Sequence, residues 1–295
     1  MGKGYGDHHL MVAILCNNDE KLEKNMKKEE IFKRFDNIKA FEAYLAKGTT
    51  LPGMSDEATT GSYSFCKTHS YHEANDLLLY GDKNLQKKIM DMGLAKLKTN
   101  LNKYVVRRQT FTAVQGFAPH VANYIAGVPN SMINARMKHI KQNVVTVYYN
   151  SAVSGNVEAS SIMESVAKLC CALIRLEAQG IRTNVYAGTL GHEDTQSVCF
   201  SVKIKSSGQP FDTLKMMYPL AHPSFNRRHK FRFVEVTEGV KPKEWRYGYG
   251  SSERDDAKTK EFLERHGLKV DRCFNYKSVQ YATVESIMKM ITNYK

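Results

Sequence analysis

The feature that most constrains the fold is the run from residue 144 to residue 181, "VVTVYYNSAVSGNVEASSIMESVAKLCCALIRLEAQGI". It begins with β-branched and aromatic residues, which are typical of a buried strand. The polar loop "NSAVSGN" follows, and apolar residues then recur at helical spacing until Gly180. We therefore predict a central parallel strand and a helix over about residues 157–179 that packs on its sheet. Five side chains of this helix are expected to face inward: Ile162, Val166, Leu169, Leu173 and Leu176.

The rest of this half of the chain alternates between strand and helix patterns. "IRTNVYAGTL" and "SVCFSVKIKS" predict two strands joined by the polar turn "GHEDTQ". The patterns that follow predict, in order, a helix around "FDTLKMMYPLAH", a strand "KFRFVEV", a helix "DAKTKEFLERHG", a strand "LKVDRCF" and a last helix "YATVESIMKMITNY". This alternation predicts an α/β fold with a mostly parallel sheet flanked by helices.

The chain divides near residue 142, into an α-rich N-terminal region (residues 1–142) and an α/β domain (residues 143–295). In the first region, "EEIFKRFDNIKAFEAYLAKG" has apolar residues near helical spacing and predicts a helix that ends at Gly48. Ser70 and Glu73 form a capping-box pattern at the start of further helices. The Gly and Pro residues in "TFTAVQGFAPHVANYIAGVPNSMINARMKHI" favour short elements.

Positive charge is concentrated in two segments of this chain of net charge +13. Residues 81–142 contain 11 Lys or Arg and 2 Asp or Glu, and residues 203–246 contain 10 and 4. Such clustering is the pattern of a protein that binds nucleic acid, DNA or RNA, or an acidic protein. A solvated basic surface without a ligand is the alternative. We expect one continuous basic face made of Arg107, Arg108, Arg136, Lys138, Arg227, Arg228 and Lys230.

An aromatic, glycine-rich loop adds a second candidate binding feature. Trp245, Tyr247 and Tyr249, interleaved with Lys243 and Arg246, place stacking faces beside cations, which is an arrangement that binds unstacked bases. A packed, structural role for the tryptophan is the alternative.

The element order and the loop after the first strand resemble the von Willebrand factor A-type domain. That resemblance implies a divalent metal held by an Asp-x-Ser-x-Ser loop, with help from a later Thr and Asp. Here the aligned loop contains Asn150, Ser151 and Ser154, the serine spacing differs, and Glu238 in "FVEVTEG" stands at the later acidic position. Because the loop has no carboxylate of its own, we expect no metal and a degenerate, Rossmann-like A-type domain. The loop then serves as a partner surface, or it caps the helix through Asn156 or a serine.

Further segments resemble an uncharacterised family of bacteriophages and prophages. They are "GFAPHVANYIAGVPNSMINARM", the loop "NSAVSGN", "ALIRLEAQGIR" and "YPLAHPSFNRRHKFRFVEV". The resemblance covers most of residues 60–237 and implies a phage-encoded protein without an assigned activity.

Two histidine clusters are the candidates for chemistry. His222 and His229 bracket two arginines and suit phosphate binding or acid–base work, and "THSYHE" offers His69, His72 and Glu73 as metal ligands. In both cases a structural role is the simpler reading. The sequence contains no phosphate-binding loop of the Walker type, no GxSxG and no HExxH motif.

Cysteine content and hydropathy bear on the compartment. Six cysteines lack zinc-ligand spacing, so we expect reduced and mostly buried thiols. No apolar run approaches the roughly 20 residues that span a bilayer. We therefore expect no membrane partner and a cytoplasmic protein, in a host cell if phage-encoded, or a virion component.

The leading hypothesis is a non-catalytic, phage-encoded binding protein, without a cofactor, that holds nucleic acid or an acidic partner on its basic surface. The first alternative is a protein-interaction or virion-assembly component without nucleic-acid affinity. The second is a phosphodiester-processing enzyme that uses the His222 to His229 cluster.

Overall fold

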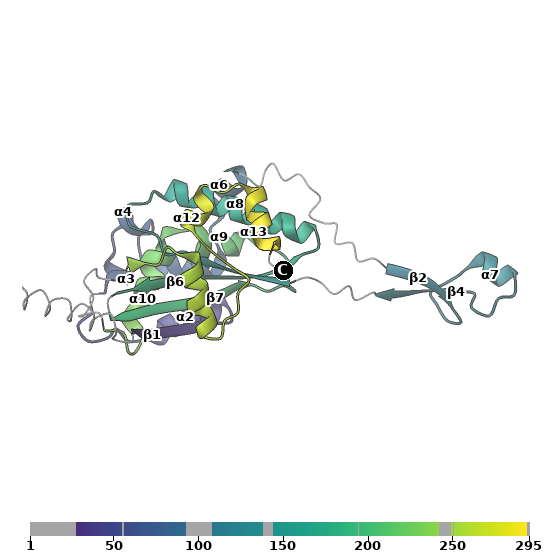
Figure 1. Cartoon of the computed structure of the whole chain (residues 1–295), viewed down its shortest axis with the longest axis horizontal. Coiled ribbons are helices and arrows are strands. Elements are labelled where there is room, and N and C mark those ends of the chain that lie inside the picture. The colour runs from purple at the N-terminus through teal and green to yellow at the C-terminus, as the bar shows by residue number, and fades with distance from the viewer. Residues whose placement is uncertain are drawn as a thin grey trace, which may run out of the picture.

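Strand β5 (Val144–Asn150) lies inside the main sheet of the protein, with a parallel neighbour on each side. The computed structural model describes residues 28–54, 56–92, 108–137, 144–193, 195–241, 249 and 251–293. Within these residues the main sheet has six strands in the order β1-β7-β6-β5-β9, with β8 beside β6 (Figure 1). The other strands are β1 (Glu29–Phe35), β6 (Arg182–His192), β7 (Gln196–Lys205), β8 (Ser251–Ser252) and β9 (Arg272–Asn275).

The sheet is mixed but mostly parallel. β5 runs parallel to β6 and to β9, and β1 runs parallel to β7. β6 and β7 form the predicted antiparallel hairpin, and β8 also pairs antiparallel with β6. The α/β fold class with a mostly parallel sheet flanked by helices is therefore confirmed.

Helices cover the two faces of the sheet unequally. The main-body helices are α2 (Ile38–Lys47), α3 (Glu57–Thr60), α4 (Tyr63–Cys66), α5 (Tyr71–Tyr80), α6 (Lys83–Met92), α8 (Ala159–Ala178), α9 (Thr213–Ala221), α10 (Lys230–Val236), α11 (Asp256–Arg265), α12 (Tyr276–Gln280) and α13 (Val284–Thr292). Most of them contribute to the larger core, whereas α11 packs Phe262 and Leu263 into a smaller core with Tyr148 and Tyr186 of the strands. Since β-strand side chains alternate in direction, Tyr148 and Tyr149 belong to different cores.

The central strand and its helix agree with the sequence-based prediction. Each of the five side chains expected to face inward from α8 is at most 5% exposed. The helix ends before Gly180, whose φ of +87° is a conformation that glycine adopts easily. Its N-cap is Glu158, without a side-chain cap bond, so the prediction of capping by Asn156 or a serine was wrong.

Two predicted elements were wrong. Residues 29–35 form strand β1 and not the start of a helix, because they add a parallel edge strand to β7.

"KFRFVEV" forms helix α10, which continues from a π-helical turn (Phe225–His229). In the helix, Phe233, Val234 and Val236 are buried together, and this packing outweighs the strand-like alternation of the sequence. Glu238 and Gly239 consequently lie in a turn after a helix, and not at a strand end.

The expected boundary at residue 142 does not separate two hydrophobic cores. Phe41 of α2, Leu78 of α5 and Ile89 of α6 belong to the same core as α8, and β1 pairs with β7. The segment from residue 28 to residue 92 is therefore part of the main body.

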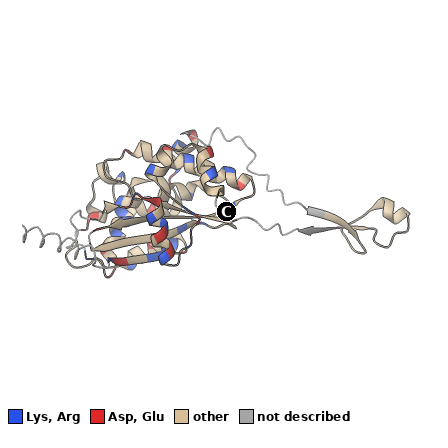
Figure 2. Ribbon diagram, in the orientation of Figure 1, with Lys and Arg blue, Asp and Glu red and all other residues tan. Residues whose placement is uncertain are grey.

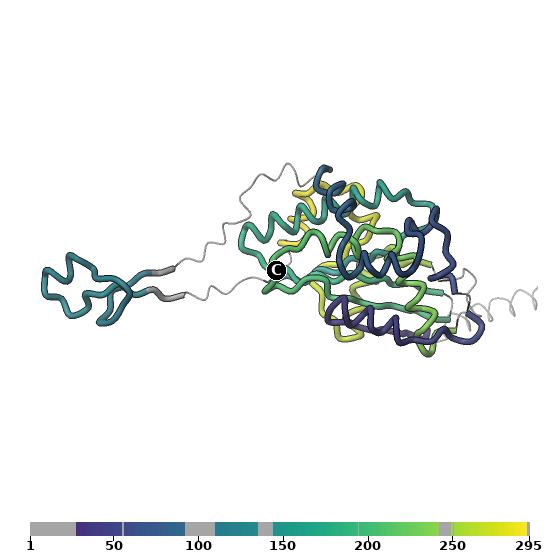
Figure 3. Tube along the Cα trace, turned by 180° about the vertical axis from the view of Figure 1, so that it is seen from behind, coloured from purple at the N-terminus to yellow at the C-terminus, as the bar shows by residue number. Residues whose placement is uncertain are grey.

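A small antiparallel sheet lies apart from this body, as the opposite views in Figures 1 and 3 show. It contains β2 (Arg108–Ala113), β3 (Ala118–Pro119) and β4 (Met132–Met137) in the order β2-β4-β3, with the short helix α7 (Val121–Ile125) at its tip. The prediction of short elements in this segment is confirmed. We call residues 108–137 the arm.

Five of the six cysteines lie in the described residues, and all five are free and buried, as predicted; Cys16 lies outside them. Among the helices that the structure describes, none is both long and apolar enough to span a bilayer.

Candidate functional site

The loop after β5 is held in place by hydrogen bonds between the Asn150 side chain and backbone groups of three segments. Its amide oxygen accepts from the N–H groups of Ala152 (3.1 Å) and Leu190 (3.3 Å), and its amide nitrogen donates to the carbonyl of Glu253 (3.1 Å). Ser151 Oγ donates to the Gly188 carbonyl at 3.0 Å. These two predicted loop residues are therefore buried structural groups, and Asn150 does the work of joining β5, β6 and the segment before α11.

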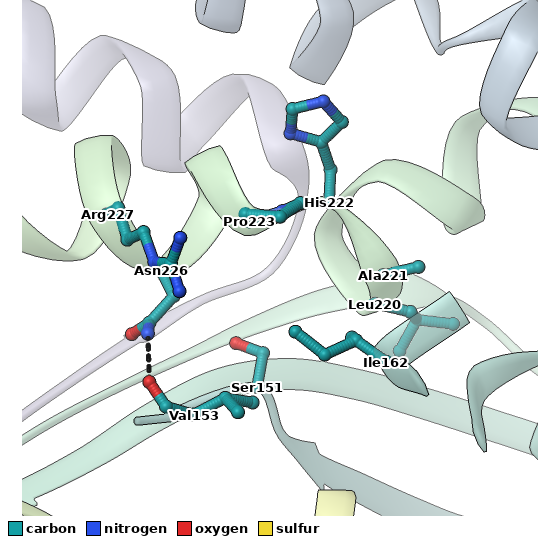
Figure 4. Close-up of a pocket in the computed structure, with 9 residues that line it drawn as sticks. All are labelled: Ser151, Val153, Ile162, Leu220, Ala221, His222, Pro223, Asn226 and Arg227. Atoms are coloured by element: carbon teal, nitrogen blue, oxygen red, sulfur yellow. Dashed lines mark hydrogen bonds between the residues drawn. The ribbon is translucent and has the colours of Figure 1, made fainter. Parts of the chain in front are cut away.

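A small cavity lies beneath the loop, between Ser151, Ile162 and the end of α9 (Figure 4). Asn226 closes one side of it by donating to the Val153 carbonyl at 3.0 Å. The cavity has a volume of about 10 Å³, which is room for about one water molecule. It is too small for a ligand.

An open groove of about 570 Å³ lies above the same loop, at the carboxyl ends of β5 and β6. Crevices at this edge of an open α/β sheet are common ligand sites. Its lining is Phe65, Val153, Ser154, Gly155, Asn226, Arg227, Lys230, Phe231, Tyr249, Ser251, Ser252 and Arg254. The described residues thus supply three cations, three hydroxyl-bearing serines and no carboxylate to the lining.

Lys230 is the most unusual residue of the groove. Lys230 is only 5% exposed. Its amine lies beside Gly191, near the end of β6, close to the space that a side chain at position 191 would occupy. Among the described residues, none forms a hydrogen bond or an ion pair with this amine. Burial lowers the pKa of Lys230 to about 8, although the carboxylate of Glu193 acts in the opposite direction. A buried ammonium without a close counter-ion favours binding of an anion at this point.

Aromatic rings form one wall of the groove. Phe231 stacks on Tyr249 with ring centroids 4.0 Å apart, and Phe65 lies 6.2 Å from Phe231. Arg227 lies over the Phe65 ring at 4.3 Å and donates to the carbonyls of Phe65 and Gly155. The guanidinium of Arg227 therefore joins α4 to the loop after β5 and fixes the shape of the groove.

A family model matches residues 18–293, almost the whole chain. The chain belongs to the family described as a domain of unknown function, DUF7192. This description assigns no activity to this DUF7192 protein. Searches among curated proteins and among solved structures found no match.

The structure divides the predicted basic residues among different places. Ser154, Arg227 and Lys230 come together in the groove. Arg228 is fully buried and lies elsewhere: it donates to Thr68 and to the carbonyls of Ala58, Thr59 and Gly61. The expectation that Arg227, Arg228 and Lys230 form an exposed face was therefore wrong, because the π-helical turn directs them into the body.

The other predicted residues cannot be added to this site. Arg108 lies on β2 and Arg136 on β4 of the arm, and the structure describes the strands but not these two side chains. Arg107, Lys138, Trp245, Arg246 and Tyr247 lie outside the described residues. The predicted continuous basic face thus remains a prediction for those positions.

The candidate catalytic histidines do not line the groove. His229 is fully buried against Tyr218, and burial lowers its pKa to about 3. His222 lines the small cavity, accepts from the Ser224 N–H, and has a pKa lowered by burial to about 4. His69 stacks on Tyr63, and His72 is exposed, with its Nδ1 atom 3.2 Å from the carboxylate of Asp76. In this structure all four make structural contacts.

Sequence reasoning missed Phe65, Phe231 and Arg254 as groove residues. If "NRRHKF" had been predicted as a helix, Arg227, Lys230 and Phe231 would have fallen on one face of it, because residues at i, i+3 and i+4 are neighbours on a helix. Phe65 and Arg254 come from distant segments and have no such signal.

A second groove, of about 730 Å³, lies at the opposite edge of the sheet. It combines Asp36 and Asp212 with Lys39, Lys203 and Lys215. Since both charge signs are present, this groove does not select an anion.

Proposed function

We propose that this protein is a non-catalytic binding protein that holds single-stranded nucleic acid in the groove at the carboxyl ends of β5 and β6. A phosphate group would lie at Lys230 and Arg254, within reach of the serine hydroxyls. A base would lie against Phe65 or Tyr249.

The observation that carries the proposal is the Lys230 amine, which is buried, without a close partner among the described residues, and beside an aromatic wall. Cations next to stacking faces are what single-stranded nucleic acid binds without sequence preference. The aromatic wall favours nucleic acid over an acidic protein, because a carboxylate needs no stacking partner.

Binding of a fluorescein-labelled 12-nucleotide strand, followed by fluorescence anisotropy, tests the proposal. Lys230→Met should weaken binding and lower the logarithmic salt slope by about 0.7, the contribution of one phosphate contact on a single strand. Lys269→Met is the matched control, because it removes the same charge from an exposed position just before β9, at the other edge of the sheet. An unmodified protein that does not bind at about 50 mM salt contradicts the proposal.

An acidic protein is the second candidate ligand, supported by the excess of cations. Phe65→Ala separates the two. It should weaken oligonucleotide binding and leave binding of a polyglutamate peptide unchanged; the reverse result favours the acidic partner. A phosphodiester-processing enzyme is the weakest candidate, since His222 and His229 lie outside the groove.

We also propose that the scaffold is a degenerate A-type domain of phage origin. The order of β5, α8, β6 and antiparallel β7 supports the first part. Genes for virion or replication proteins beside this gene would support the second, and a chromosomal setting without phage genes would oppose it.

A further inference from the structure

The arm exposes an unusual amount of apolar surface. Five of its large apolar side chains are at least 65% exposed: Val114, Phe117, Val121, Tyr124 and Ile125. Val128 follows at 41%. A concentration of exposed large apolar side chains in one short segment marks a surface that another body covers.

The distribution of charge indicates what that body is. Residues 109–135 contain no Lys, Arg, Asp or Glu, and Figure 2 accordingly shows the described part of the arm without acidic or basic colouring. The flanking sequence is the reverse. Between Asp91 and Glu158 the chain has no acidic residue, but it has eight basic ones: Lys96, Lys98, Lys103, Arg107, Arg108, Arg136, Lys138 and Lys141.

We propose that the arm binds the surface of an anionic lipid bilayer with its uncharged, apolar tip in the interface; the excess of Lys and Arg in the adjoining sequence favours anionic headgroups. This combination of an apolar segment with Lys and Arg beside it is what interfacial membrane binding requires. Tyr124 suits the same position, because its ring is apolar and its hydroxyl can remain hydrated. The arm contacts the interface and does not span it, so this inference revises the expectation of no membrane partner.

Two other occupants fit less well. Nucleic acid would meet a tip without a single Lys or Arg, where phosphate contacts need cations. A second copy of this chain would carry the same excess of positive charge, which disfavours the close approach of two copies. No residue of the arm is among the described residues that line the groove, so the two proposals can fail separately.

Flotation of the full chain with phosphatidylcholine vesicles that contain about 30% phosphatidylglycerol is the test. The unmodified protein should float with these vesicles, and should float less with pure phosphatidylcholine or at high salt. Phe117→Ser combined with Ile125→Ser should lower the partition coefficient about tenfold or more, because two large apolar side chains are lost from the interface. Tyr281→Ser is the control, since Tyr281 is 86% exposed on the main body; it should change the coefficient less than about twofold.

A spectroscopic measurement checks insertion directly. The chain has one tryptophan, so Phe117→Trp in a Trp245→Phe background places a single reporter on the arm. Its emission should shift to shorter wavelength with anionic vesicles. An unshifted emission, or equal flotation of the tip variant and the unmodified protein, overturns the proposal. A tip variant that instead converts a dimer to a monomer in sedimentation, without vesicle binding by either protein, assigns the arm to a second copy.

Discussion

Lys205 Nζ lies 2.5 Å from Glu177 Oε1, and neither side chain is more than 5% exposed. Glu177 is the penultimate residue of α8 and Lys205 is the last residue of β7. Thr183 of β6 completes the network: it donates its N–H and hydroxyl to Glu177 and accepts from Lys205 at 3.1 Å. One buried pair thus holds the end of the main helix to two neighbouring strands.

Removing one partner of this pair should be more damaging than removing both. We expect Lys205→Met to lower the free energy of unfolding by about 3–5 kcal/mol, because it leaves an unpaired buried carboxylate. Adding Glu177→Leu should recover a large part of the loss. Urea denaturation of the two single variants and the double variant measures this; additive losses would contradict the pairing.

Arg228 should be essential for the segment from α3 to the start of α5. Its guanidinium donates to Thr68 Oγ1 at 2.7 Å and to the Ala58 carbonyl at 2.7 Å, with further bonds to Gly61 and the Thr68 carbonyl. We expect Arg228→Met to cost more than about 3 kcal/mol, since several buried carbonyls lose their donors. Arg228→Lys should rescue little, because an ammonium cannot reproduce the planar fork. The exposed Arg265→Met, which should cost less than about 1 kcal/mol, is the control for charge.

Stability should fall in mild acid because two histidines are held neutral. Burial lowers the pKa of His229 to about 3 and that of His222 to about 4. Below pH 6.5 the unfolded chain takes up protons that the folded protein does not, so the free energy of unfolding falls as the pH falls from 6.5 towards 4. The loss is on the order of 3 kcal/mol for each histidine. In His229→Phe the decline over this range should be about half as large; an unchanged profile would refute the assignment.

Gly188 should tolerate no side chain. A Cβ atom there would lie 2.0 Å from the Phe200 carbonyl oxygen and 2.8 Å from the hydroxyl of Tyr148. We expect Gly188→Ala to lower the free energy of unfolding by at least about 2 kcal/mol, because β6 and β7 would have to separate. Gly208→Ala is the matched control, since nothing lies within 4 Å of its Cβ position. A thermal melt of both variants distinguishes a local clash from a general effect of replacing glycine.

Anion binding in the groove should weaken as the pH rises above about 8. The pKa of Lys230 is lowered to about 8 by burial, so half of the free protein has a neutral amine at that pH. Oligonucleotide affinity measured from pH 7 to pH 9.5 should fall in the unmodified protein and be flat in Lys230→Met. A parallel decline in both proteins would assign the pH dependence to another group.

The sequence predicts the middle of the fold better than its edges. β5 and α8 were predictable because each is long and has one clear periodicity, and because burial of Val166 and Leu173 agrees with it. Residues 29–35 were not predictable, because a short segment at the edge of a sheet forms a strand only when it pairs with its neighbour, here β7. Residues 230–236 alternate like a strand, and only the packing of Phe233 and Val236 against the body selects a helix.

The candidate site was predictable in part. Ser154, Arg227 and Lys230 were identified from local sequence, and the structure places them in one groove. Their burial was not predictable, since a cluster such as "NRRHK" reads as a solvated surface until the partners of each cation are known. Arg228 illustrates this: apart from the Thr68 hydroxyl, its acceptors are backbone carbonyls about 160 to 170 residues away, and backbone carbonyls have no sequence signature.

The pairing of β1 with β7 has a consequence for synthesis on the ribosome. Glu29 lies opposite Gln196, so the strand that emerges first must wait for a partner 167 residues later. At 5 to 20 residues per second this delay is roughly 8 to 33 seconds. During that time residues 29–35 have no sheet to join, which leaves them available to chaperones and to other nascent chains. This edge therefore forms only after β7 has been synthesised, and slower elongation between the two strands would lengthen the exposure.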